Sequence, residues 1–128
     1  MIVFDYHKNS QGIYFPIIPV TLIDSESKKF DTTALIDSGA NISIFNYDVA
    51  KQLGVEIEKG EEVFLGGVGG RIKGYIHEII IEVSGKSFKI PVVLSREYLV
   101  SFNLLGRKGF FEEFKIAFDE KNRIIELT

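Results

Sequence analysis

A short apolar run that ends in an acid, a hydroxyl and a glycine is the feature that most limits how this chain can fold. Leu35 and Ile36 read as the end of a buried strand, and Asp37, Ser38 and Gly39 follow at once. Glycine permits a sharp turn and a close approach of another backbone segment. Because a second apolar segment follows the loop, the acid lies where the pKa of a carboxylate can be shifted and used. The stretch is therefore a candidate active-site loop.

The composition indicates one β-rich domain. The chain has 128 residues, which suffices for one sizeable core but not for two. Hydrophobic residues make up 45% of it, with 11 phenylalanines and many isoleucines and valines, which favour strands. We therefore expect residues 1–128 to form a single all-β domain.

Charge and composition argue against several classes of protein. The net charge of −3 is spread over interspersed lysines and acids, without the basic stripe that nucleic acid requires. No apolar run is long enough for a transmembrane helix, and residues 1–5 lack the basic start of a signal peptide. There is no cysteine, and His7 and His77 lack neighbouring ligand residues, so we expect no metal and no other cofactor. We expect a cytoplasmic protein without nucleic-acid or membrane partners.

The first half of the chain predicts a hairpin that leads into the Asp37 loop. Residues 13–23 and 30–36 read as strands joined by a polar turn. The tetrapeptide Leu-Ile-Asp-Ser ends at Ser25 as well as at Ser38. At its first occurrence no glycine follows and a charged turn begins, so we interpret Asp24 as a solvated turn residue.

Two short helices are expected. Asn46 is placed to cap a helix over residues 47–53, and Gly54 is its stop signal. Residues 108–114 predict a second helix, amphipathic through three phenylalanines.

Glycines mark the tip of another hairpin. Residues 61–65 and 71–83 read as its strands, and Gly66-Gly67-Val68-Gly69-Gly70 joins them. This run is not a phosphate loop, because no Gly-Lys-Ser/Thr follows and a strand comes next. Strands over residues 88–94, 115–119 and 123–127 complete a mostly antiparallel domain.

Three segments in the expected order resemble one family. Leu35 to Ala40 resembles the catalytic loop of the retropepsin-like aspartic proteases, and Leu65 to Gly70 resembles their glycine-rich flap. Leu104 to Arg107 resembles the apolar-apolar-Gly-Arg segment that packs under that loop. The similarity is to the prokaryotic-type, single-domain members and extends over roughly residues 15–115. It implies a half-barrel with one or two short helices, acting as a two-fold homodimer.

The resemblance implies roles for the loop residues. Asp37 is the catalytic carboxylate, Ser38 bonds the loop of the partner subunit, and Gly39 holds the turn that aims the acid. Asn41 stands where the family often has Asp, and we group it with the substrate-binding residues. A charge-assisted hydrogen bond between Arg107 and Asn41 would then replace the family's salt bridge.

The resemblance also assigns the flap and the supporting segment. Gly67, Val68 and Gly69 form the flap tip, which offers backbone amides to the substrate and excludes water on closure. Gly106 and Arg107 support the catalytic loop from below.

The chemistry of this family explains the expected homodimer. Peptide hydrolysis by this route needs two carboxylates that share one proton. Asp-Ser-Gly occurs once in the chain, so the second Asp37 has to come from an identical subunit across a two-fold axis. Retroviral members interleave both termini in an interface sheet, and here the hairpin over residues 114–127 could do that job differently.

We expect an aspartic endopeptidase that cleaves peptides or proteins between apolar residues. The alternative is a protease-fold module that cleaves poorly or not at all and binds peptides or protein partners. A structural or regulatory domain is a third interpretation, since most isolated Asp-Ser-Gly sequences are turns. Ser38 as a serine nucleophile is disfavoured because no base accompanies it and Gly-x-Ser-x-Gly is absent.

Overall fold

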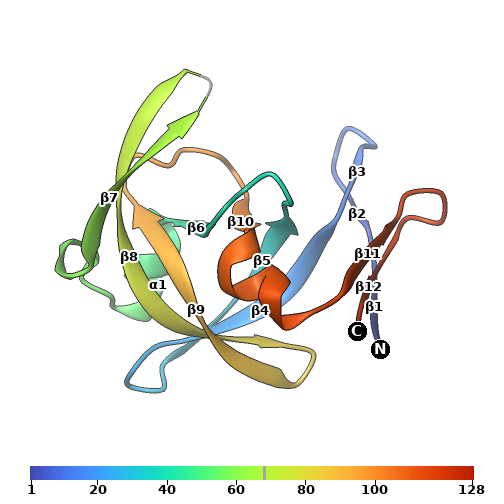
Figure 1. Cartoon of the computed structure of the whole chain (residues 1–128), viewed down its shortest axis with the longest axis horizontal. Coiled ribbons are helices and arrows are strands. Elements are labelled where there is room, and N and C mark those ends of the chain that lie inside the picture. The colour runs from blue at the N-terminus through green and yellow to red at the C-terminus, as the bar shows by residue number, and fades with distance from the viewer. Residues whose placement is uncertain (68) are drawn as a thin grey trace.

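A computed structural model describes residues 1–67 and 69–128 of the chain (Figure 1). Its main element is a seven-stranded sheet in the order β4-β5-β10-β6-β9-β8-β7, and β4 also pairs with β8, so the sheet curls back on itself. A three-stranded sheet, β1-β12-β11, and a two-stranded ribbon, β2-β3, complete the β structure. In chain order the elements are β1 (Ile2–Asp5), β2 (His7–Lys8), β3 (Tyr14–Phe15), β4 (Ile17–Ile23), β5 (Lys29–Ile36), β6 (Ser43–Asn46), α1 (Tyr47–Leu53), η1 (Ile57–Lys59), β7 (Glu61–Gly67), β8 (Gly70–Val83), β9 (Lys86–Ser95), β10 (Asn103–Leu105), η2 (Arg107–Phe111), β11 (Ile116–Asp119) and β12 (Ile124–Leu127).

The hydrophobic core lies against the inner face of the curled sheet. Alternate residues of a strand point to opposite faces, and β4 follows this rule with Ile18, Val20 and Leu22 buried and Pro19 exposed. The same alternation buries Ala34 and Ile36 of β5. The prediction of an all-β domain is confirmed, with a break in the first predicted strand at residue 16, where proline has no N–H to donate.

Helix α1 confirms the first helix prediction. The side chain of Asn46 accepts a hydrogen bond from the backbone N–H of Val49, at the N-terminus of the helix. Gly54 ends the helix in the left-handed conformation, with φ +70°. The apolar face made by Val49, Ala50 and Leu53 is buried.

The second helix is shorter than the predicted range of residues 108–114. Lys108 and Gly109 are not helical, and Gly109 has φ +87°. A Cβ at Gly109 would lie 3.0 Å from Ile90, so close packing on β9 sets this backbone conformation. The phenylalanines of the segment contribute to the core, where Phe110 and Phe114 contact Phe88.

The two chain termini meet in the small sheet (Figure 1). Strands β11 and β12 form the predicted C-terminal hairpin, and β1 pairs antiparallel with the other edge of β12. The pairing continues past β1, because the N–H of Tyr6 donates to the carbonyl of Arg123. The N-terminal strand therefore pairs with the C-terminal hairpin of its own chain.

Strands β7 and β8 form a long hairpin that projects from the body of the molecule (Figure 1). The register pairs Gly66 with Arg71 and Gly67 with Gly70 across its end. Val68, predicted at the tip, lies outside the described residues. No helix in the described part of the chain is long and apolar enough to cross a membrane.

Candidate active site

Asp37 lies at the end of β5, where the chain leaves the sheet in a tight turn. Its N–H donates to the carbonyl of Leu105 at 3.0 Å, which ties the start of the loop to the end of β10. The N–H of Ala40 donates to the carbonyl of Asp37 at 3.2 Å and closes the turn. The N–H of Gly39 donates to the side-chain Oδ1 of Asp37 at 2.8 Å. The backbone of the loop therefore orients the carboxylate.

The Gly-Arg segment after β10 supports this loop through backbone contacts. The N–H of Arg107 donates to the carbonyl of Ala40, and that of Lys108 donates to the carbonyl of Asn41, both at 2.8 Å. The N–H of Gly106 donates to Oγ of the fully buried Ser43 at 3.0 Å. Both Gly106 and Arg107 thus lie next to the Asp37 loop.

The expected side-chain bond between Arg107 and Asn41 is absent from the described part of the chain. Both side chains are exposed and flank an open pocket of about 410 Å³ that Phe111 also lines. The two segments are joined through their main chains, so replacing the family's Asp by Asn41 removes none of these contacts.

Tyr98 is a neighbour of Asp37 that sequence analysis did not identify. It lies in the connection between β9 and β10, is 8% exposed, and its hydroxyl donates to the carbonyl of Phe102 at 2.8 Å. Burial and, to a smaller extent, the negative charge of Asp37 raise the pKa of Tyr98 from 10.0 to about 12. The signal available in the sequence is an aromatic residue shortly before the apolar segment that ends in Gly106 and Arg107.

The β7–β8 hairpin carries the remaining predicted site residues, Gly67 and Gly69. Both are exposed, and Gly69 has φ +98°, which favours glycine. A Cβ at either glycine would have nothing within 4 Å, so the structure does not bring them onto Asp37. In Figure 1 the end of this hairpin stands apart from the end of β5.

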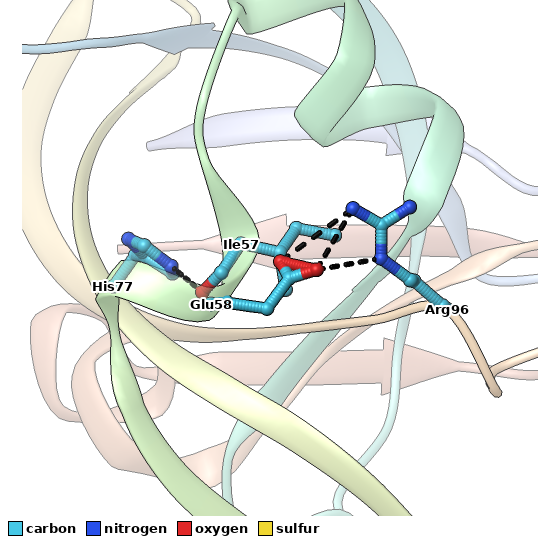
Figure 2. A network of polar contacts seen from close by, with 4 residues as sticks. All are labelled: Ile57, Glu58, His77 and Arg96. Carbon is cyan, nitrogen blue, oxygen red and sulfur yellow. Dashed lines mark hydrogen bonds and ion pairs between the residues drawn. The ribbon is translucent and has the colours of Figure 1, made fainter.

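Polar contacts fasten the base of the hairpin to its surroundings (Figure 2). The imidazole Nε2 of His77 on β8 is 2.8 Å from the carbonyl oxygen of Ile57 in η1. Arg96, just after β9, donates from Nε to the carboxylate of Glu58 at 2.9 Å. The next residue, Glu97, accepts a hydrogen bond from the N–H of Lys73 on β8. The connection that holds Tyr98 therefore also contacts the hairpin.

Comparison with known proteins agrees with this arrangement. A family model described as aspartyl protease matches residues 18–107. No curated protein sequence matches the chain.

Two solved structures show how far the fold similarity extends. A retropepsin-like aspartic protease from Rickettsia conorii superimposes with a TM-score of 0.68 at 19% identity, over 98% of this chain and 98% of that chain. EIAV protease, solved in complex with the inhibitor HBY-793, superimposes with a TM-score of 0.56 at 22% identity, over 73% of this chain and 82% of that one. These identities are low, so the two similarities concern the fold. With its matching family model and its retropepsin-like fold, the chain belongs to the aspartyl protease family.

Proposed function

We propose that this protein is an aspartic endopeptidase whose active site forms between two copies of the chain. The observation that carries the proposal is the position of Asp37, in a turn whose backbone fixes Oδ1 of the carboxylate. Asp-Ser-Gly occurs once in the sequence, so each chain supplies one such carboxylate. A homodimer with its two-fold axis beside this loop would supply the second.

Two adjacent carboxylates supply the proton transfers that peptide hydrolysis needs. Two negative charges at close range repel each other, so the pair holds one shared proton. The ionised Asp37 takes a proton from water as the water attacks the peptide carbonyl, and the protonated Asp37 donates to the carbonyl oxygen, which gives a tetrahedral intermediate with two hydroxyls. The Asp37 that took the proton then donates it to the amide nitrogen as the C–N bond breaks, and the other Asp37 takes a proton back from one of the hydroxyls as the new carboxyl group forms. The N–H of Gly39 keeps each carboxylate in place during this exchange.

The β7–β8 hairpin would act as the flap over a peptide substrate. Its glycines, Gly67 and Gly69 around Val68, would present backbone amides to an extended peptide and exclude water when closed. An extended peptide fits this role because its main chain can bond to a strand-like hairpin edge while its side chains enter alternate pockets.

Cleavage of an unbiased peptide mixture over a pH series tests the proposal. We expect wild-type protein to cut with a bell-shaped pH dependence, because one carboxylate must be ionised and the other protonated. Asp37→Asn should reduce the rate by on the order of 10²- to 10⁴-fold, the usual contribution of acid–base catalysis.

Asp24→Asn is the matched control, because the same Leu-Ile-Asp-Ser tetrapeptide surrounds Asp24. There the carboxylate accepts hydrogen bonds from the N–H groups of Glu26 and Lys28 in a surface turn. Asp24→Asn should leave cleavage unchanged. If wild type, at concentrations where it is a folded dimer, cuts nothing, the proposal fails, and the alternative of a peptide-binding module replaces it.

A further inference from the structure

The β7–β8 hairpin extends beyond the strand that supports it (Figure 1). Strand β8 pairs with β9 from Tyr75, opposite Leu94, to Val83. Between Gly70 and Gly74 it pairs with β7 alone, and β7 is the edge strand of the sheet. Residues 63–67 and 70–74 thus form a projecting arm of two strands. Because two strands alone are only marginally stable, the position of the arm depends on contacts where β9 ends.

Two side chains continue the pairing of β8 for one more position. If β9 ran on in the same register, Arg96 would lie opposite Lys73. Instead, Oγ of Ser95 donates to the carbonyl of Lys73 at 2.6 Å, and the N–H of Lys73 donates to the carboxylate of Glu97 at 3.2 Å. The N–H of Glu97 also donates to Oγ of Ser95 at 3.0 Å. Side chains thus satisfy the two main-chain groups that a longer β9 would have bonded.

The two bonds to Lys73 differ in how easily they open. Ser95 is fully buried. A Cβ at Gly74 would collide with the side chain of Val93, so β8 passes directly over β9 beside Ser95. Glu97 is exposed and its bond to Lys73 is the longer one, so water can replace it. The arm therefore has a fixed point at Gly74 and a releasable contact at Lys73.

The segment that holds the arm is itself anchored to the body of the molecule. Arg96 donates to Glu58 at 2.9 Å, and its guanidinium lies 4.4 Å from the ring centroid of Tyr47 (Figure 2). Two residues further on, the buried Tyr98 lies close enough to Asp37 to respond to its charge. One short segment therefore relates the arm both to the body and to the catalytic loop.

We propose that Glu97 is a positioning residue of this site, whose hydrogen bond to Lys73 holds the arm in the orientation that receives a peptide. The inference rests on the proposed peptidase function. Without this bond the arm samples more orientations about Gly74, so a smaller fraction of the molecules is ready to bind, and the apparent affinity for peptide falls accordingly. The Asp37 loop is tied to Leu105 instead, so the chemical step should not depend on Glu97.

Steady-state cleavage of a peptide that wild type cuts tests this role. Glu97→Ala should raise KM by about two- to tenfold, the effect of one lost hydrogen bond, and leave kcat within about twofold of wild type. Glu97→Gln keeps an oxygen that accepts the N–H of Lys73, so it should restore most of the wild-type KM. Glu82→Ala is the matched control, because Glu82 lies at the far end of β8 and also accepts a hydrogen bond, from Ser87. It should leave both constants unchanged.

Amide hydrogen exchange measured by NMR reports on the arm without any substrate. In Glu97→Ala the N–H of Lys73 should exchange about two- to tenfold faster than in wild type, and Glu97→Gln should restore its protection. The amides of β8 between Tyr75 and Val83 should exchange at the wild-type rate, because β9 holds that part of the strand.

The two measurements separate this inference from the peptidase proposal. If wild type cuts no peptide, the peptidase proposal fails, and faster exchange at Lys73 that Glu97→Gln reverses still supports the role of Glu97 in holding the arm. Unchanged exchange at Lys73 in Glu97→Ala overturns the inference. If wild type cuts, an unchanged KM in Glu97→Ala overturns it whatever the exchange shows. So does a fall in kcat at constant KM, which would place Glu97 in the chemical step.

Discussion

Gly106 lies directly against the backbone of Ile42. A Cβ at Gly106 would be 2.5 Å from the carbonyl carbon of Ile42 and 2.6 Å from its oxygen. Neither atom belongs to a flexible side chain, so any larger residue has to displace the segment that follows the Asp37 loop. This close approach joins the Gly-Arg segment to the catalytic loop.

Gly106→Ala is therefore expected to destabilise the fold. Forcing a methyl group into a packed site costs about 1–3 kcal/mol. Urea denaturation of Gly106→Ala and wild type would measure this cost as a lower free energy of unfolding. Gly67→Ala is the control, because a Cβ there has nothing within 4 Å. Its stability should stay within about 0.5 kcal/mol of wild type. Equal stabilities of the two variants would contradict the structural role of Gly106.

Asn103 is expected to stabilise the junction of three strands. It is 4% exposed, its Oδ1 accepts a hydrogen bond from the N–H of Asn46, and its Nδ2 donates to the carbonyl of Thr33 at 3.0 Å. Asn103→Leu leaves both backbone groups without these partners, which should cost about 1–3 kcal/mol of unfolding free energy. Asn122→Ala, in an exposed turn, serves as the control in the same denaturation series and should stay close to wild type. A stable Asn103→Leu would mean that water replaces the lost contacts.

The sequence predicted the turn at Asp37 and the ends of α1, because the signals for both are local. Asp37 and Gly39 follow an apolar strand and indicate a turn, and Asn46 and Gly54 mark the ends of α1. Backbone conformation at such positions depends on the residue itself, so a short motif suffices to predict it.

Contacts between distant segments were not predictable in the same way. The pairing of β1 with β12 joins the two ends of the chain, and no residue in β1 signals its partner. Tyr98 feels the charge of Asp37 although 60 residues separate the two in the sequence, and no local signal marks that proximity. The helix predicted from residue 108 was wrong at Lys108 and Gly109, which are not helical. Close packing of Gly109 against Ile90 determines the backbone conformation there.

Tyr98 makes the stability of the fold sensitive to alkaline pH. Its pKa is raised from 10.0 to about 12, so the folded state keeps the phenol proton where the unfolded chain has lost it. The corresponding stabilisation is complete below pH 10 and is lost as the pH rises toward 12. Its size is no more than about 2 kcal/mol, because solvent near the loop screens the effect.

Tyr98→Phe tests this linkage. The variant also loses the hydrogen bond to the carbonyl of Phe102, so it should be less stable than wild type at pH 8 by about 1 kcal/mol. The difference in unfolding free energy should shrink between pH 10 and 12, as only wild type has this phenol to ionise. A difference that is the same at pH 8 and pH 11.5 would show that Tyr98 is not protected in the folded state.

Ser38 is expected to act between subunits. Its side chain is exposed on the Asp37 loop. The family resemblance implies that its hydroxyl forms a hydrogen bond with the backbone of the partner subunit's loop. A two-fold dimer would contain this hydrogen bond twice. Each of the two would contribute about 0.5–1.5 kcal/mol to the free energy of dimerisation. Ser38→Ala should therefore raise the dimer dissociation constant in sedimentation experiments by on the order of tenfold. Thr keeps the hydroxyl, so Ser38→Thr should restore dimerisation. Unfolding of the monomer at high dilution should be the same in all three proteins, and a loss of monomer stability in Ser38→Ala would instead place the hydroxyl's role within one chain.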